Sequence, residues 1–205
     1  FFCNNITFAD GYKISGKIKG LKDKTSVTLA YYFGGKQYSV ETVKANNGKF
    51  TFKGKEKVEG GMYLIVLPED VYFDIIISEQ EFSFSTDLDD LIGSMKFKNS
   101  VENPPFYEYL NFITRMQKQV TPIRLQLKSA KGNRKQKLQK EADEIDLEVK
   151  TYRENFINNY YDKFFTKIII ATTEINIPES PLDLNGEPDK TFPYRYYKKH
   201  FWDNI

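Results

Sequence analysis

A β-hairpin is predicted by residues 27–43, whose sequence is Val27-Thr-Leu-Ala-Tyr-Tyr-Phe33, Gly34-Gly35, Lys36-Gln-Tyr-Ser-Val-Glu-Thr-Val43. The two outer runs are rich in β-branched and aromatic residues, which favour strands. A Gly-Gly pair between such runs is typical of a two-residue hairpin turn, because both turn positions adopt positive φ. We therefore expect two antiparallel neighbours in a sheet.

Short runs of the same kind surround this hairpin. Ile14, Gly16 and Ile18 alternate with lysines, which is the period-2 pattern of a half-buried strand. Similar runs follow at residues 49–53, 62–67, 71–77 and 81–85, separated by turn residues such as Asn47-Gly48 and Pro68. Strands at this regular spacing predict an antiparallel β-sandwich of about seven strands over residues 10–98.

From Asn103 the apolar period changes to that of a helix. Pro104 and Pro105 fit a first helical turn, Pro122 is expected to kink the helix, and Gly132-Asn133 breaks it. The predicted apolar stripes are Phe106, Leu110, Ile113, Met116, Val120, Ile123 and Leu127, then Leu138, Ala142, Ile145, Val149, Tyr152, Phe156 and Tyr160.

Two such helices joined by a short turn predict an antiparallel helical hairpin at residues 99–177. Several prolines and Gly186 then predict a Pro-rich loop and the start of a truncated helical region at residues 178–205. The expected fold class is α+β.

The composition excludes most catalytic and metal chemistry. The 205 residues include one cysteine, Cys3, and one histidine, His200, too few for a disulfide, a Cys-rich zinc site or a histidine cluster. The 30 basic and 28 acidic residues give a net charge of +2, too balanced for a strongly polyanion-seeking protein. We therefore expect no catalytic residue, no bound cofactor and no metal site, and no nucleic-acid partner.

The N-terminal residues 1–9 are apolar and end in Thr7-Phe-Ala9 before Asp10, which is typical of the end of a secretory signal peptide. The alternatives are a frayed N-terminus, a first strand or, less favoured by the bulky residues before it, lipid attachment at Cys3. No run of 18 apolar residues exists, so no transmembrane segment is expected.

Three other patterns favour structure over chemistry. Gly11–Ile18 approaches a phosphate-binding loop, but Ile18 replaces the magnesium-binding hydroxyl, so the glycines indicate bulges or tight packing. The bases of residues 128–140 and the acids of residues 141–148 predict salt-bridged, solvated helix faces, and a binding patch is the alternative. Glu69, Asp70 and Asp74 are candidates for an acid pair, although nothing in the sequence predicts a raised pKa there.

A dense aromatic cluster lies near the C-terminus. Such a cluster needs cover, either from the preceding helices or from a following segment, and it predicts an interdomain or partner surface. Its residues are Phe192, Tyr194, Tyr196, Tyr197, Phe201 and Trp202.

Several strings in the chain resemble one protein family. They are Gly20–Asp23, Tyr31–Tyr38, Gly61–Pro68, Tyr72–Asp74, Met95–Ser100, Glu102-Asn103, Phe106-Tyr107 and Phe192–Asn204. The chain is similar to Bacteroidetes-type envelope proteins that begin with a β-sandwich domain of unknown function and end in a thioredoxin-like (AhpC/TSA, thiol–disulfide oxidoreductase) domain.

This resemblance implies a periplasmic or cell-envelope location and a longer parent protein whose Cys-x-x-Cys site has no counterpart here. It favours a non-catalytic accessory or scaffold module that positions the downstream redox domain of the same polypeptide or docks a partner. Homo-oligomers are compatible with it. The alternative hypothesis is an autonomous β-sandwich binding module, whose aromatic residues grip a peptide or a glycan.

Overall fold

The computed structural model describes residues 11–173, 175–182 and 186–201. The chain divides into two compact units, of which the first ends at Asp146 and the second begins at Leu147. The first contains the sheets and the second contains α3 and α4, while α2 runs across the boundary. The signal-peptide end predicted at residues 1–9 lies outside the described residues, as do Cys3 and Trp202.

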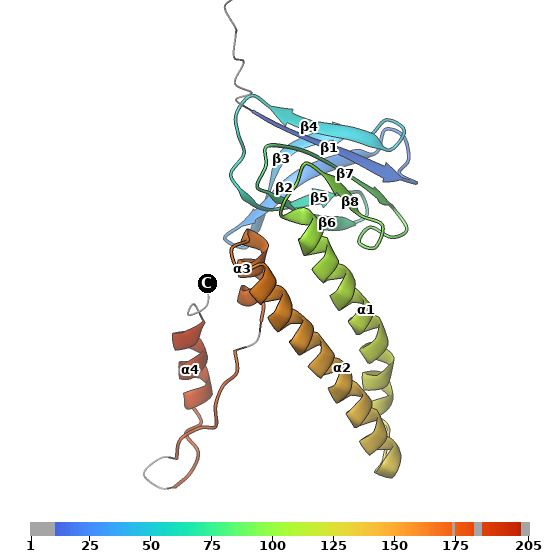
Figure 1. Cartoon of the computed structure of the whole chain (residues 1–205). Helices are drawn as coiled ribbons and strands as arrows, with labels where there is room; N and C mark the ends of the chain where they lie inside the picture. The colour runs from blue at the N-terminus through green and yellow to red at the C-terminus, as the bar shows by residue number, and fades with distance from the viewer. Residues whose placement is uncertain (1–10, 174, 183–185, 202–205) are drawn as a thin grey trace, which may run out of the picture. The chain divides into compact units, whose positions relative to one another are not determined.

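Eight strands form two four-stranded sheets in the first unit (Figure 1). One sheet has the order β4-β1-β7-β8 and the other has the order β3-β2-β5-β6. Their bounds are β1 Tyr12–Lys19, β2 Ser26–Phe33, β3 Lys36–Lys44, β4 Lys49–Gly54, β5 Gly61–Val66, β6 Tyr72–Ile77, β7 Glu81–Asp87 and β8 Lys96–Lys98.

The prediction of an α+β fold with about seven sandwich strands is confirmed, and the structure adds two features. β8 is an eighth strand of three residues, too short to give an alternating signal in the sequence. β1 pairs in parallel with β7, whereas every other pair of neighbouring strands is antiparallel. The predicted Gly34-Gly35 turn joins β2 to β3, and both glycines have positive φ (55° and 78°).

A single apolar core lies between the two sheets. Inward-facing residues such as Ile14, Leu29, Ile65 and Ile75 are fully buried. Gly16 also faces inward, because a Cβ at this position would overlap the rings of its neighbours Phe50 and Phe84. The sequence expectation of tight packing at this glycine is therefore confirmed, and aromatic rings from both flanking strands fill the space above it.

The sheet β3-β2-β5-β6 is apolar on its outward side as well. Ala30, Leu64 and Ile76 point away from the core between the sheets, yet each is at most 2% exposed. Ile76 is covered by the first residue of the helix that follows the sandwich, through a contact described below. This pattern differs from the other sheet, whose outward side is polar.

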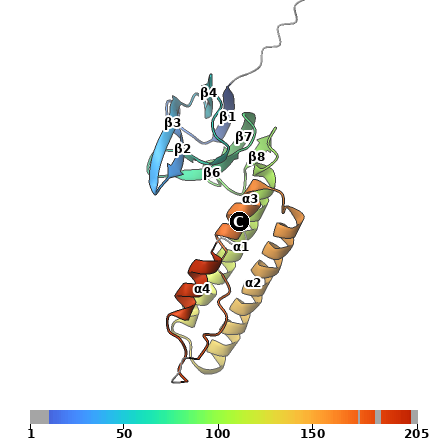
Figure 2. The same ribbon diagram turned by 90° about the vertical axis from the view of Figure 1, so that its left-hand side faces the viewer.

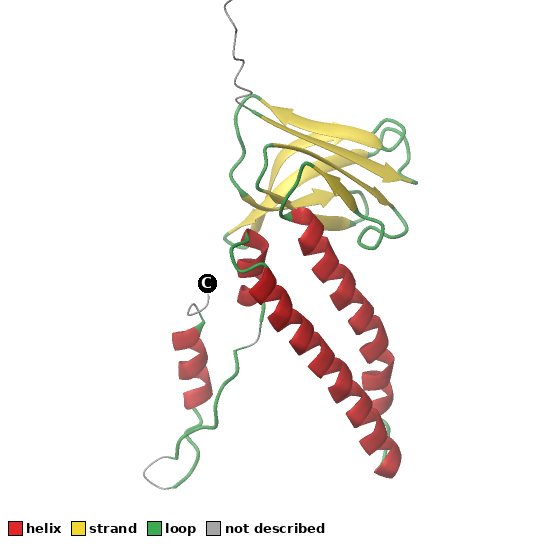
Figure 3. Cartoon of the chain, in the orientation of Figure 1, coloured by secondary structure: helices red, strands yellow, loops and turns green. Residues whose placement is uncertain are grey.

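Two long helices follow the strands, α1 at Asn103–Leu127 and α2 at Gly132–Asn159 (Figure 3). α1 starts beside β8 in both views of the chain, and the two elements are in contact (Figures 1 and 2). Within the first unit, Arg124 of α1 binds Asp146 of α2 through both carboxylate oxygens, at 2.7 and 2.8 Å. This ion pair joins the two arms of the predicted helical hairpin.

The predicted helix stripes are only partly buried. In α1, Phe106, Met116 and Val120 are buried as expected, but Tyr109 and Phe112 are buried in place of the half-exposed members of the stripe. In α2 the buried members of its stripe are Leu138, Ala142 and Phe156. α1 continues through Pro122, although this residue has no N–H to donate to the preceding turn and the helix therefore lacks one backbone hydrogen bond there.

The second unit contains the end of α2 and two short helices, α3 at Phe164–Ala171 and α4 at Phe192–His200. Phe165 of α3 is fully buried and lies 5.7 Å from the ring of Phe156 and 5.5 Å from that of Tyr160. Thr166 donates a hydrogen bond to the Tyr160 carbonyl. These contacts fix the turn between α2 and α3.

Candidate functional site

A buried polar contact joins α1 to the edge of a sheet. Asn103, the first residue of α1, is fully buried. Its Oδ1 accepts a hydrogen bond from the Ile76 N–H at 2.8 Å, and its Nδ2 donates to the Ile76 carbonyl at 2.6 Å. The amide thus pairs with the edge strand β6 as a further strand would.

Tyr107, one helical turn later, extends the same joint. Its hydroxyl donates to the Asp74 carbonyl at 2.7 Å, and its ring lies 5.1 Å from the ring of Phe97 on β8. Burial raises the pKa of the Tyr107 hydroxyl, and the charge of Asp74 adds a smaller effect in the same direction. The hydroxyl therefore stays protonated and keeps donating its hydrogen bond. Asn103 and Tyr107 together fix the start of α1 against β6 and β8.

The three residues that were candidates for an acid pair lie in different environments. Glu69 and Asp70 lie exposed in the turn before β6, where both residues have positive φ. Asp74 is half-buried on β6, and burial raises the pKa of its carboxyl. Nothing in the sequence indicated this raised pKa, because the sequence does not show that Asp74 is partly buried where α1 begins.

The acidic residues at the end of β7 and just after it have structural partners. Asp87 accepts hydrogen bonds from Lys19 and from the Asp89 N–H, and Asp90 accepts one from the Gly93 N–H. These bonds close the turn after β7. The described residues contain no cluster of three His, Cys, Asp or Glu side chains able to hold a metal ion.

The aromatic cluster predicted as a partner surface lies on and just after α4. Within the described part of this helix no residue is buried, and Tyr194 and Tyr197 are 69% and 43% exposed. Phe192 and Tyr196 lie 5.6 Å apart by ring centroids, and Tyr197 and Phe201 lie 5.4 Å apart. Trp202, the sixth predicted member, lies outside the described residues.

A second exposed aromatic group occupies the tip of the β2–β3 hairpin. Tyr32, Phe33 and Tyr38 are 59%, 73% and 42% exposed. Tyr38 stacks on Tyr31 at 5.6 Å, and Tyr31 in turn lies against the buried Tyr63 at 5.9 Å. The hairpin tip therefore presents aromatic side chains that are anchored to the core.

The gathering of lysines on one outward face of the sandwich is a feature that the sequence analysis missed. The outward side of the sheet β4-β1-β7-β8 carries only lysine, serine, threonine and two acidic residues. Its lysines are Lys13, Lys17, Lys19, Lys49, Lys53, Lys96 and Lys98. We call this surface the lysine face. The alternation of lysines in β1 and β4 is a signal in the sequence. Together with the pairing of these strands, it predicts the lysine face.

The basic block at residues 128–140 behaves as its solvated interpretation predicted. Lys137 and Lys140 lie 4.0 and 3.9 Å from Glu141 and Glu144, the acids four residues later on the same helix. Such exposed pairs contribute only about 0.3–0.5 kcal/mol each. Across the described residues, none of the helices combines the length and apolar character that a membrane crossing requires.

Comparison with known families identifies the first part of the chain. Residues 12–116, just over half of the sequence, match the model of a family described as Domain of unknown function (DUF4369). The match covers all eight strands and the first half of α1, including Asn103 and Tyr107. The chain therefore belongs to this family. No curated protein matches the chain.

Proposed function

We propose that this member of the DUF4369 family is a non-catalytic module of a cell-envelope protein. It positions a thioredoxin-like thiol–disulfide oxidoreductase domain of the same polypeptide, or docks a partner of that domain. The observation that carries the proposal is the buried joint of Asn103 and Tyr107, which holds α1 in a fixed direction relative to the sandwich.

A fixed helix suits a positioning role for a mechanical reason. If α1 were tethered to the sandwich by a flexible linker alone, its direction would vary and could not place a neighbouring domain. Two buried polar contacts one helical turn apart restrict both tilt and rotation of the helix start. The exposed aromatics of α4 then supply the contact surface, because large apolar patches on soluble proteins mark interaction sites.

The redox part of the proposal is tested by reading the encoding gene onward from the codon of Ile205. A Cys-x-x-Cys pair in a downstream thioredoxin-like segment is expected. A gene without such a segment contradicts the redox part. In parallel, the chain alone should not reduce insulin when thioredoxin serves as the positive control, and turnover that is lost in Cys3→Ser would show that the chain itself is catalytic.

The contact surface is tested by fluorescence of a dye that binds exposed apolar groups. The double variant Tyr194→Ser and Tyr197→Ser should lower dye binding by this chain, and the longer gene product should suppress it without any substitution. A matched control replaces Tyr32 and Phe33 on the hairpin tip, which removes two aromatics of similar exposure. If the longer product binds the dye as strongly as the chain alone, α4 does not contact the added domain.

The hairpin tip favours a second candidate, an autonomous module that grips a peptide or a glycan. Tyr32, Phe33 and Tyr38 form an exposed aromatic group of the kind that stacks on sugar rings or packs on peptide side chains. In this case a ligand found by peptide and glycan arrays should lose binding in Phe33→Ala and keep it in Tyr194→Ser. The opposite result would favour the α4 surface.

A further inference from the structure

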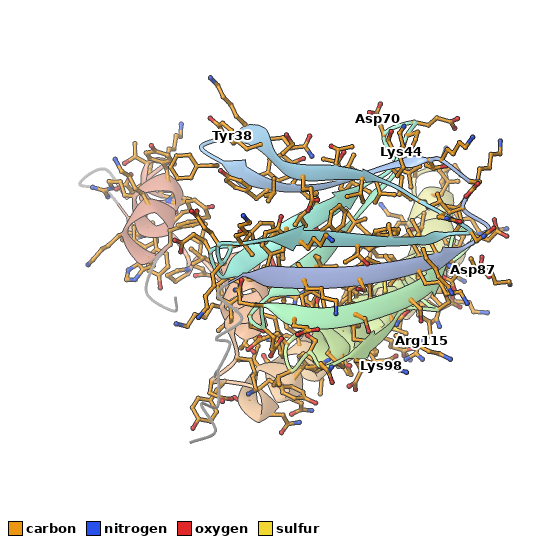
Figure 4. The ribbon with its side chains drawn as sticks, turned by 90° about the horizontal axis from the view of Figure 1, so that it is seen from above. Tyr38, Lys44, Asp70, Asp87, Lys98 and Arg115 are labelled. Carbon is orange, nitrogen blue, oxygen red and sulfur yellow. The ribbon has the colours of Figure 1, made fainter. Side chains whose placement is uncertain are left out.

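The lysine face has a regular layout that follows from the strand register. Lys17 lies directly opposite Lys49, and Lys13 lies opposite Lys53. On the other side of β1, Ser85 separates Lys17 from Lys96, and Ser83 separates Ser15 from Lys98. The face is therefore a plane of short hydroxyl side chains from which the longer lysines extend. Figure 4 shows this sheet from above, with Asp87 and Lys98 labelled near its margin.

Acidic side chains on this face neutralise only its ends. Glu81 lies 3.1 Å from Lys13 and Asp87 lies 2.7 Å from Lys19. Within the described residues the other five lysines form no ion pair, and all five are exposed; they are Lys17, Lys49, Lys53, Lys96 and Lys98.

The lysine pairs that face each other across the strands work against stability. Like charges directly opposite in an antiparallel pair repel and destabilise a sheet. Lys17 and Lys49 are such a pair, and no acid of the described residues bridges them. These opposed lysines do not stabilise the fold. Binding of an external anion, which would neutralise their charge, accounts for their placement.

The shape of the face selects among anions. A shallow groove of about 580 Å³ lies on this sheet. Its lining combines hydroxyl residues (Ser15, Thr51, Ser83, Ser85) and lysines (Lys17, Lys49, Lys96, Lys98) with Gly16, Phe50, Phe84 and Phe97. The rings of Phe50 and Phe84 pack on the core side of Gly16, so the groove cannot deepen into the sandwich. The groove is too open to enclose a small ligand, and it exposes hydroxyls and ammonium groups side by side.

We propose that the lysine face is a docking surface for an anionic phospholipid bilayer. A bilayer presents phosphates on an extended, laterally mobile surface, which matches lysines spread over three strands of the sheet better than any single compact ligand does. Lysine, unlike arginine, binds phosphate as a point charge and requires no fixed geometry. The outward positions of this sheet carry no aromatic side chain for stacking on bases, which disfavours single-stranded nucleic acid.

This docking is independent of the proposed positioning role. It is peripheral and electrostatic, because the outward positions of the sheet carry no apolar side chain to enter the hydrocarbon layer. Each lysine close to an anionic surface contributes about a five-fold increase in partitioning. Loss of three lysines should therefore weaken binding on the order of 100-fold, and added salt should weaken it further.

The test is co-sedimentation of the chain with vesicles of phosphatidylcholine alone and of phosphatidylcholine mixed with phosphatidylglycerol. The test variant is Lys17→Gln, Lys49→Gln and Lys96→Gln. The matched control is Lys128→Gln, Lys131→Gln and Lys135→Gln, which removes the same charge from the basic block at residues 128–140. Thermal unfolding checks that both variants are folded, and loss of the Lys17–Lys49 repulsion should leave the test variant at least as stable as the wild type.

The expected result is salt-sensitive binding to the mixed vesicles only, lost in the test variant and kept in the control. Equal losses in both variants would mean that net charge alone matters and would overturn the proposal. Equal binding to both vesicle types, or no binding to either, would overturn it too. A parallel arm uses heparin as a soluble polyanion, and binding to heparin without binding to anionic vesicles would show that the occupant is not a bilayer.

Discussion

Replacement of Asn103 by alanine tests the joint between α1 and the sandwich most directly. The side chain is fully buried, and its two hydrogen bonds satisfy both backbone groups of Ile76, which is itself fully buried. In Asn103→Ala the Ile76 N–H and carbonyl lose these partners without gaining access to water. The variant therefore leaves two buried polar groups unsatisfied.

The magnitude follows from the number of orphaned groups. Each buried donor or acceptor left without a partner costs about 1–3 kcal/mol. Two groups give a loss of about 2–6 kcal/mol in the free energy of unfolding, compared with the 5–15 kcal/mol that stabilises a typical domain. The variant should therefore fold, but with a much lower urea midpoint and an unchanged denaturant slope.

Two measurements distinguish this effect from general loss of packing. Urea unfolding gives the free energy, and native-state hydrogen exchange should show faster exchange at the Ile76 amide than at the paired amides of β5. The matched control is Asn155→Ala, an exposed asparagine of α2, which should change stability by less than about 0.5 kcal/mol. A loss below about 0.5 kcal/mol in Asn103→Ala, with normal protection of Ile76, would refute the reasoning.

Three further substitutions test other parts of the structure. Gly16→Val should destabilise the sandwich by about 1–3 kcal/mol in urea unfolding, because its side chain overlaps the ring of Phe50; a neutral result would refute the packing argument. Asp74→Asn should raise the free energy of unfolding at pH 7, because burial raises the pKa of Asp74 and its charged form destabilises the folded state. That gain should shrink as the pH falls through the raised pKa toward the ordinary range, since the folded wild type then takes up the proton; a gain that persists at low pH would contradict it. Asp146→Asn should cost less than about 1 kcal/mol, and high salt should remove the difference, because its ion pair with Arg124 is exposed on both sides.

Local patterns in the sequence were sufficient for the elements themselves. The alternation in residues 12–19 and the Gly34-Gly35 turn depend on neighbours a few residues apart, and the corresponding strands and hairpin are present. The change of period at Asn103 likewise predicted the start of α1, and the prolines that follow it fit the first turn. The predicted stripe of α1 was less accurate, since Phe112 and Tyr109 are buried beside Phe106.

The candidate surfaces also differ in whether local sequence was enough to predict them. The aromatic cluster of α4 was visible in the sequence, because it depends on residue type within one short segment. The buried joint was not, because Asn103 resembles an ordinary residue at a helix start until β6 is placed beside it. The raised pKa of Asp74 was missed for the same reason, since desolvation depends on which element covers the carboxyl.

The order of residues alone determined which segments of this protein form strands, turns and helices, because those choices depend on side chains within one or two turns of the backbone. Tertiary structure decided that β1 pairs in parallel with β7, that Asn103 completes the edge of β6, and that the lysines gather on one face of a nearly neutral sandwich. Each of these depends on strand register and on contacts between residues far apart in the chain, and a shift of one position in the register would send every lysine of β1 to the core.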